Sequence, residues 1–366
     1  MKTYRAAVIG CSRMGAFIDN EVVGAPGHIP PYAHTASYYA CPRTDLIACS
    51  DIRPEVMEEV GNQFDIPKTG QYTDYKELID KEKPDIVSVA TQPEHRAEIM
   101  IYAVENGARA IYAEKALCAS MSEADAIVEA CERNNAVLNI GTQRRWSPGF
   151  VKMREVIESG RIGALRTVVF SGSSLFNGAS HYYDNLLFLN GDAKASWVQM
   201  SLVPGNLTKS GSDWEIQGNR LTDDPVSHGM IQFENDVTAY AVLSPHEMEW
   251  EASCERGTVT AWPGGFYRLR EEGPEGFRGT PTIVSGRFPS FKKYSSNLRL
   301  VEDLVNSLDT GQPPIGGVRS AHASTELIFA SIESHQRGGA RVDIPLKESK
   351  IYLLRDRDPR KPRFKA

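Results

Sequence analysis

The first 145 residues alternate short apolar runs with amphipathic stretches, and this alternation limits the possible folds more than any other feature. The apolar runs lack a polar face, which is typical of parallel strands covered on both sides. Between them, Pro54 and Gly107 mark a helix start and a helix end, and Ser120 with Glu123 has capping-box spacing. The pattern predicts an α/β domain built on a doubly wound parallel sheet. Its strands are expected at residues 4–10, 45–51, 85–91, 108–114 and 136–142.

Beyond residue 146 the pattern changes to extended stretches with fewer helices. Helices are expected near 149–159, 296–309 and 319–336, and Asn235 with Asp236 suits a hairpin turn. This half therefore predicts an α+β domain with a mostly antiparallel sheet. The expected division is a first domain at 1–145 with an inserted loop at about 19–40, a second domain at 146–345, and a charged C-terminal arm at 346–366.

Composition and charge limit the partners and the compartment. The 366 residues exceed one ordinary core, which agrees with two domains. A formal charge of −6 without polybasic runs argues against nucleic acid or a membrane as partner, and no apolar run approaches the ~18 residues of a membrane span. The N-terminus enters a strand pattern at once, unlike a signal peptide. The six cysteines lack CxxC spacing, so we expect free thiols in a cytoplasmic protein and no metal site.

The first predicted strand runs into "VIGCSRMGAF", which has two of the three glycines of a dinucleotide-binding loop. Gly10 and Gly15 fit a G-x-G-x-x-G pattern, and Ser12 replaces the middle glycine. In that pattern the middle glycine lets a pyrophosphate approach the backbone. A small serine can stand there and donate a hydrogen bond. With Arg13 and Met14 these residues form the predicted cofactor loop, and its place after an N-terminal strand favours a nucleotide ligand.

The strand at 45–51 ends in Asp51, where an acidic residue would hold the adenosine ribose hydroxyls and favour NAD. Asp51 lies 36 residues beyond Gly15, further than the usual ~20, which indicates an insertion between them. Arg53 can contact a 2′-phosphate, so NADP stays open. The alternative is that Asp51 only neighbours the N-terminus of the helix at Pro54.

Five stretches along nearly the whole chain carry a further signal. They are "VIGCSRMG", "SVATQPEHRAEI", "AEKALCAS", "GTQRRWSPGFVKMREVIESGRIG" and "GGARVDIPL". Together they resemble the Gfo/Idh/MocA family, named for glucose–fructose oxidoreductase and inositol dehydrogenase. The resemblance implies a Rossmann domain that binds NAD, with Thr91, Gln92 and His95 in the segment beneath the nicotinamide. It also implies a C-terminal α/β domain whose large open sheet often forms a homodimer or homotetramer interface.

Lys115 matches the lysine of the family's Glu-Lys-Pro signature, with Ala116 in place of the proline. It follows a strand on the side of an open sheet where ligands bind. The resemblance implies that Lys115 stabilises a developing alkoxide. Glu114 either orients Lys115 or the nicotinamide amide, or forms a plain ion pair at the strand end. A solvated strand end is the alternative for Lys115, and Ala116 leaves the geometry of the lysine open.

The second catalytic candidate is His181 in "SLFNGASHYYDN", where Asn177, His181 and Asp184 fall on one helical stripe. The resemblance implies that His181 accepts the hydroxyl proton, a role that suits an imidazole with an ordinary pKa near 6.5. Asn177 stands where relatives carry an aspartate; it can orient the imidazole or bind a substrate hydroxyl. Asp184 can supply negative charge one turn later. The alternative is a core histidine satisfied by its neighbours.

Substrate-binding candidates lie at the junction of the two halves. Arg144, Arg145 and Trp146 follow the strand at 136–142, and Tyr182 follows His181. Arginine and aromatic side chains suit the edges and faces of a sugar ring, although a structural role at the domain interface is equally open for each. Arg145, Trp146 and Tyr182, together with Asn177 and Asp184, are the predicted substrate-binding residues.

The leading hypothesis is an NAD(P)-dependent dehydrogenase that moves hydride between nicotinamide and a ring hydroxyl of a sugar, glycoside or cyclitol. One alternative is a glycosidase that uses held NAD for transient oxidation and elimination. Another is a sugar or nucleotide sensor without catalysis. The presence of both Lys115 and His181 favours an enzyme over a sensor.

Overall fold

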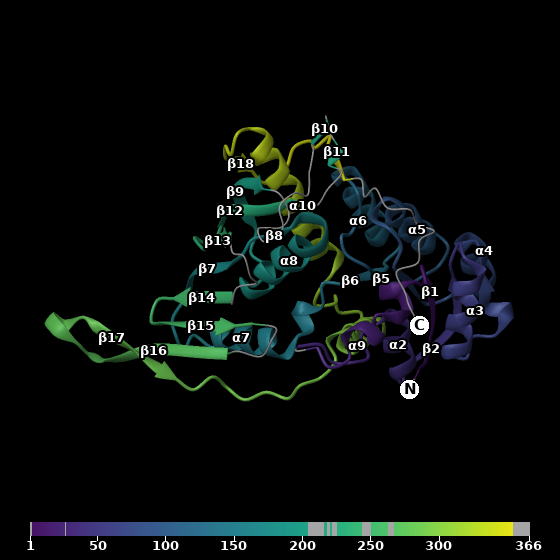
Figure 1. The fold of residues 1–366 in the computed structure, drawn as a ribbon, viewed down its shortest axis with the longest axis horizontal. Helices are drawn as coiled ribbons and strands as arrows, with labels where there is room; N and C mark the ends of the chain where they lie inside the picture. Colours follow the sequence, from purple (N-terminus) through teal and green to yellow (C-terminus); the bar gives the residue numbers. More distant parts are fainter. Residues whose placement is uncertain are drawn as a thin grey trace.

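The computed structural model describes residues 2–25, 27–203, 216–217, 220–221, 225–243, 250–262 and 267–353 (Figure 1). Its N-terminal part is the predicted doubly wound sheet, with six parallel strands in the order β3-β2-β1-β4-β5-β6. The third strand spans only two residues, too few to show as a pattern in the sequence. The strands are β1 (Tyr4–Ile9), β2 (Thr44–Ser50), β3 (Gln71–Tyr72), β4 (Ile86–Val89), β5 (Ala110–Ala113) and β6 (Val137–Ile140).

Side chains of β1 alternate between two hydrophobic cores, because successive strand residues point to opposite faces of a sheet. Ala7 and Ile9 join one core, whereas Ala6 and Val8 join the other. Both faces of the sheet are therefore covered, as the unbroken apolar runs predicted. The helices of this half are η1 (Arg13–Phe17), α1 (Asp19–Val22), α2 (His34–Ala40), α3 (Pro54–Gln63), η2 (Lys68–Gly70), α4 (Tyr75–Glu82), α5 (Pro93–Glu105), α6 (Met121–Arg133) and η3 (Gln143–Trp146).

Helix boundaries follow the predicted signals. Pro54 is the first residue of α3. The Ser120 hydroxyl accepts a hydrogen bond from the Glu123 backbone N–H at 3.2 Å, just before α6 begins. Gly107, after α5, has φ of +105°, a conformation that costs glycine little because it lacks a Cβ. Along the chain, α5 precedes β5 and α6 follows it, so these local signals bracket the strand and its end.

The segment expected as an inserted loop is folded onto the domain through α1, α2 and a late helix, α9 (Ser296–Thr310). The Asp19 carboxylate accepts hydrogen bonds from the backbone N–H groups of Tyr32 and Ala33, at 2.8 and 2.6 Å. The Ser295 hydroxyl, which caps α9, donates to the Pro31 carbonyl at 2.5 Å. The apolar side of α9 joins the core that contains Ala6 and Val8. The chain thus returns to complete one face of its first sheet.

The second half contains a large mixed sheet in the order β17-β16-β15-β14-β7-β13-β12-β9-β18, with β8 paired to β12. Its pairs are antiparallel except β7 with β13, and β12 turns into β13 at the predicted hairpin, where Asp236 has φ of +63°. The β16–β17 hairpin projects from the body (Figure 1). The strands are β7 (Leu165–Ser171), β8 (Ser173–Ser174), β9 (Ala195–Val203), β12 (Val226–Phe233), β13 (Thr238–Val242), β14 (Trp250–Cys254), β15 (Gly257–Ala261), β16 (Tyr267–Glu275), β17 (Pro281–Gly286) and β18 (Val342–Asp343).

The two halves share a hydrophobic core. It runs from Ile111 and Leu117 of the first half to Phe150, Phe170 and Trp250 of the second. The Phe170 and Trp250 rings stack at a centroid distance of 4.7 Å. A packed junction of this kind holds residues from both halves in fixed relative positions. The remaining helices are α7 (Pro148–Glu158), η4 (Leu175–Ala179), α8 (Ser180–Leu189), η5 (Phe277–Gly279) and α10 (Val318–Gln336).

A small third sheet, β10-β11-β19, contains part of the expected C-terminal arm. Ile351 and Leu353 are buried, and the Leu353 N–H donates to the Ala119 carbonyl at 2.7 Å. Residues 354–366 lie outside the described part of the chain. Among the described helices, none combines the length and apolar character needed to cross a membrane. The three strands are β10 (Ile216–Gln217), β11 (Arg220–Leu221) and β19 (Tyr352–Leu353).

Candidate active site

A cavity of about 440 Å³ lies where the carboxyl ends of β5 and β6 meet η4 and α8. Residues from both halves line it. Its place beyond the carboxyl ends of parallel strands is the general position of ligands in such sheets. Its walls include seven residues singled out in the sequence: Arg13, Met14, Glu114, Lys115, Arg144, His181 and Tyr182.

The loop after β1 is closed tightly by its glycines. Gly10 has φ of +88°, and a Cβ there would lie 2.9 Å from the Ala90 carbonyl carbon. A Cβ on Gly15 would lie 2.0 Å from the Gly10 oxygen. Neither position can carry a side chain, and the turn they form brings Arg13 and Met14 to the cavity wall. Ser12 is the N-cap residue of η1 but makes no capping hydrogen bond with its side chain. The loop thus fits the close backbone approach that a dinucleotide requires.

Asp51 and Arg53 form a buried ion pair at the carboxyl end of β2, with Nε and Oδ1 2.9 Å apart. The same carboxylate accepts a hydrogen bond from the Cys11 N–H at 2.9 Å. Asp51 therefore ties the loop after β1 to the end of β2. Arg53 is also the N-cap residue of α3, so Asp51 does lie beside the N-terminus of that helix, as the structural alternative proposed. A contact between Asp51 and a ribose stays a prediction.

Lys115 and Glu114 both line the cavity, directly after β5. The Lys115–Ala116 peptide bond is cis. One oxygen of the Glu114 carboxylate accepts the Lys115 backbone N–H at 3.1 Å, and the other lies 3.3 Å from Nε2 of His34. Sequence reasoning missed His34, because it lies in the insertion, 80 residues from its partner.

Arg96 is a second residue that the sequence pattern did not single out. Its guanidinium donates to the Thr91 carbonyl, with Nε at 3.0 Å, and to the carbonyl of Ala116. It therefore connects the end of β4 with the peptide that carries Lys115. Thr91, Gln92 and His95 lie at the β4–α5 junction, with Gln92 as the N-cap residue of α5, and none of the three lines the cavity.

His181 lies on the first turn of α8 and faces the cavity from the second half. Burial, followed by the positive charges of Arg144 and Lys115, lowers the pKa of His181 well below its ordinary value of 6.5. Among the described residues its buried Nδ1 has no hydrogen-bond partner. The imidazole is thus neutral near pH 7 and positioned close to the lysine cation. The predicted partner, Asn177, has a side chain that lies outside the described residues.

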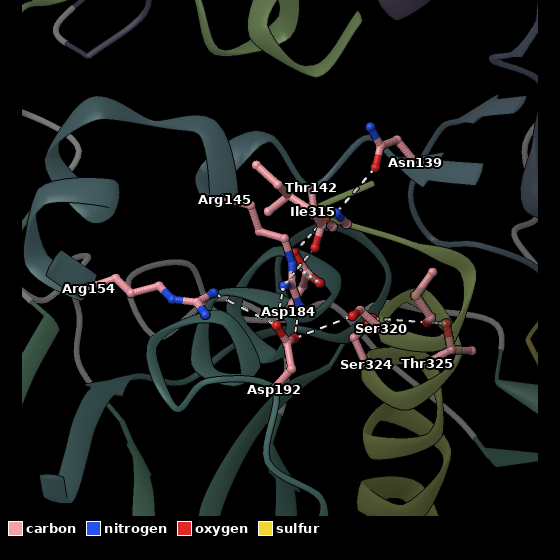
Figure 2. Close-up of polar contacts among 12 residues, drawn as sticks. Asn139, Thr142, Arg145, Arg154, Asp184, Asp192, Ile315, Ser320, Ser324 and Thr325 are labelled. Atoms are coloured by element: carbon pink, nitrogen blue, oxygen red, sulfur yellow. Dashed lines mark hydrogen bonds and ion pairs between the residues drawn. The ribbon is translucent and has the colours of Figure 1, made fainter. Parts of the chain in front are cut away.

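Arg145, Asp184 and Trp146 are not brought to the cavity, contrary to their prediction as substrate-binding residues. Arg145 is fully buried, with Nε 2.8 Å from Asp184 and Nη2 2.7 Å from Asp192 (Figure 2). Thr142 donates to the second oxygen of Asp184 at 2.6 Å. Burial lowers the pKa of Arg145, but the charge of Asp184 and the bonds to Asp192 more than offset this and raise it. These charges satisfy each other, so they serve the fold.

Trp146 is buried in the core beneath α9, against Gly316. Its neighbour Arg144 does reach the cavity, where its guanidinium lies 4.8 Å from the centre of the Tyr182 ring. Tyr182 packs its other edge against Phe170 and Trp250. Of the predicted substrate residues with described side chains, Tyr182 is therefore the one at the cavity, together with Arg144.

Known proteins resemble this chain in sequence and in fold. Residues 4–142 match the model of GFO_IDH_MocA, an oxidoreductase family with an NAD-binding Rossmann fold. A D-apiose dehydrogenase of Paraburkholderia graminis is 23% identical over 356 residues, which cover 92% of this chain and 89% of that protein. A myo-inositol 2-dehydrogenase of Thermotoga maritima is 29% identical over 118 residues, covering 32% of this chain and only 34% of that protein.

A solved structure extends the likeness to the whole fold. An oxidoreductase from Agrobacterium radiobacter, in complex with NAD+, L-tartaric acid and magnesium, superposes with a TM-score of 0.72 at 20% identity. The alignment covers 94% of this chain and 99% of that one. Residues 4–142 thus match the NAD-binding Rossmann domain of the Gfo/Idh/MocA oxidoreductases, and both halves of the chain share the fold of the solved oxidoreductase.

Proposed function

We propose that this protein oxidises a secondary ring hydroxyl of a sugar, glycoside or cyclitol with NAD, or reduces the corresponding ketone. The observation that carries the proposal is the shared cavity, in which Lys115 and His181 lie with the cofactor loop residues Arg13 and Met14. The curated relatives are by name dehydrogenases of D-apiose and of inositol, both polyhydroxylated substrates.

His181 and Lys115 have different roles in the proposed reaction: one transfers a proton and the other stabilises a charge. Bound NAD supplies the hydride acceptor, and the chain supplies placement and electrostatics. His181, neutral because of its surroundings, accepts the hydroxyl proton as the carbon–hydrogen bond breaks. Lys115, which lines the same cavity, stabilises the negative charge that develops on the same oxygen. Arg144 and the Tyr182 ring present a cation and an aromatic face to the substrate.

A substrate panel tests the proposal. Purified protein is incubated with NAD and a set of aldoses, uronic acids, glycosides and inositols, and NADH absorbance is followed. Growth of NADH with one structural group of substrates is the expected result. Release of free sugar from a glycoside without NADH accumulation would instead identify a glycosidase, and no turnover with any compound would favour a sensor.

Lys115→Met is expected to lower kcat by about 10²–10³-fold, the usual effect of removing one group that stabilises a developing oxyanion. The change keeps the length of the side chain and removes its charge. Steady-state kinetics with the substrate found in the panel provides the measurement. Lys81→Met is the matched control, because Lys81 makes an exposed i,i+4 pair with Glu77. Equal kcat values for both variants would exclude Lys115 from the chemical step.

A further inference from the structure

His34 and Glu114 form a buried pair at the wall of the cavity. The His34 ring is completely buried and stacks on Tyr112, with centroids 3.7 Å apart and an interplanar angle of 9°. Its Nδ1 lies 2.5 Å from the Ser88 hydroxyl, and its Nε2 lies 3.3 Å from the Glu114 carboxylate. Stacking and two polar contacts leave the imidazole one orientation. His34 therefore offers Glu114 a fixed partner.

Glu114 is also confined from other directions. Its second oxygen accepts the Lys115 backbone N–H at 3.1 Å. A Cβ on Gly141 would lie 2.8 Å from the first oxygen, so the absence of a side chain there leaves room for the carboxylate. Only 3% of the surface of Glu114 is exposed, yet the residue lines the cavity. These contacts hold the negative charge of Glu114 at one position on the cavity wall.

The surroundings keep this carboxylate ionised. Burial alone raises the pKa of Glu114, but the hydrogen bond and charge of His34, followed by the charges of Lys115 and Arg96, more than offset burial and lower the pKa. Two other titratable groups face it: the phenols of Tyr32 and Tyr112, whose own pKa values are raised mainly by burial. His34 is thus the first of the groups that preserve the negative charge.

We propose that His34 is a positioning residue of the active site: it holds the Glu114 carboxylate in place at the cavity wall, where a fixed negative charge favours the cationic ring of NAD+ over the neutral ring of NADH. The inference rests on the proposed placement of the nicotinamide in this cavity. It does not depend on which alcohol is oxidised. Its test therefore needs only cofactor binding.

The test measures dissociation constants for NAD+ by calorimetry and for NADH by fluorescence, at acidic and at neutral pH. His34→Leu is expected to weaken NAD+ binding about tenfold relative to NADH, the scale of one lost hydrogen bond to a charge. The loss is larger at acidic pH, because Glu114 without its partner protonates more readily. His34→Gln keeps an N–H donor and recovers most of the NAD+ preference. His322→Leu is the control, since His322 makes a more exposed pair with Asp125.

Glu114→Gln separates positioning from simple structural support. It removes the charge itself, so it loses the NAD+ preference, and adding His34→Leu to it causes no further change. An additional loss in the double variant, equal to that of His34→Leu alone, would show that His34 acts on the fold of α2 and overturn the proposal. If His34→Leu does not fold, Glu114→Gln still decides: a wild-type ratio of NAD+ to NADH affinity in that variant would refute it. Failure of the substrate panel, in contrast, leaves these binding results unaffected.

Discussion

His181→Ala lowers kcat for alcohol oxidation by about 10²–10⁴-fold, the range expected when a general base is removed. The physical reason is that His181 is neutral, buried and turned toward the cavity that also contains Lys115. No other described histidine on the second half lines this cavity. Single-turnover measurement of NADH formation reports the chemical step directly. Titration with NAD+ in the same variant checks that the cofactor loop is intact.

The pH dependence sharpens this expectation. His181 accepts a proton only when neutral, and its pKa lies below 6.5, because burial and two nearby cations disfavour the imidazolium. In the wild type, kcat should therefore stay level down to about pH 6.5 and fall only in more acidic buffer. Arg144→Gln removes one of the cations and moves the fall toward neutral pH. His322→Ala again serves as the control; a loss in it as large as in His181→Ala would contradict the role given to His181.

Asp184→Ala lowers the free energy of unfolding by about 3–5 kcal/mol, the usual cost of leaving a buried charge without its partner. Arg145, completely buried, would keep only Asp192 and the Ile315 carbonyl among its charged and polar contacts shown in Figure 2. The Thr142 hydroxyl would also lose its acceptor. Urea unfolding followed by circular dichroism measures the change.

A matched control and a paired variant make the stability result decisive. Glu77→Ala breaks an exposed pair with Lys81 and should change stability by about 0–1 kcal/mol. Replacing both Arg145 and Asp184 by methionine and leucine should cost less than Asp184→Ala, because no charge is left buried. A wild-type unfolding curve for Asp184→Ala, together with a raised KM for the substrate, would restore the substrate-binding interpretation.

Much of the first domain was predictable because its signals are local. Unbroken apolar runs mark strands buried on both faces, and Pro54, Gly107 and the Ser120–Glu123 pair mark helix boundaries within a few residues of themselves. The strand β3 escaped notice because two residues carry no pattern. In the second half, the hairpin at Asp236 was equally local, and its prediction is confirmed.

The site was predictable only in part, for the same reason. Helical spacing placed His181 and Asp184 on one stripe, but they take different partners: His181 faces the cavity, and Asp184 faces Arg145. Spacing says which side chains share a face, and it does not say what packs against that face. The adjacent residues Arg144 and Arg145 show the same limit, since one reaches the cavity and the other is buried.

By itself the sequence determined the doubly wound domain and its glycine loop, because both depend on neighbours along the chain. Its resemblance to a known family added Lys115 and His181 as the residues proposed for catalysis. The tertiary structure decided which charged side chains pair with each other in the interior and which reach the cavity. It also brought His34 of the insertion to Glu114, 80 residues away, and Arg96 to the peptide after Lys115. The His34–Glu114 pair forms only when α2 packs on the sheet and is held by α9, and no local pattern records that contact.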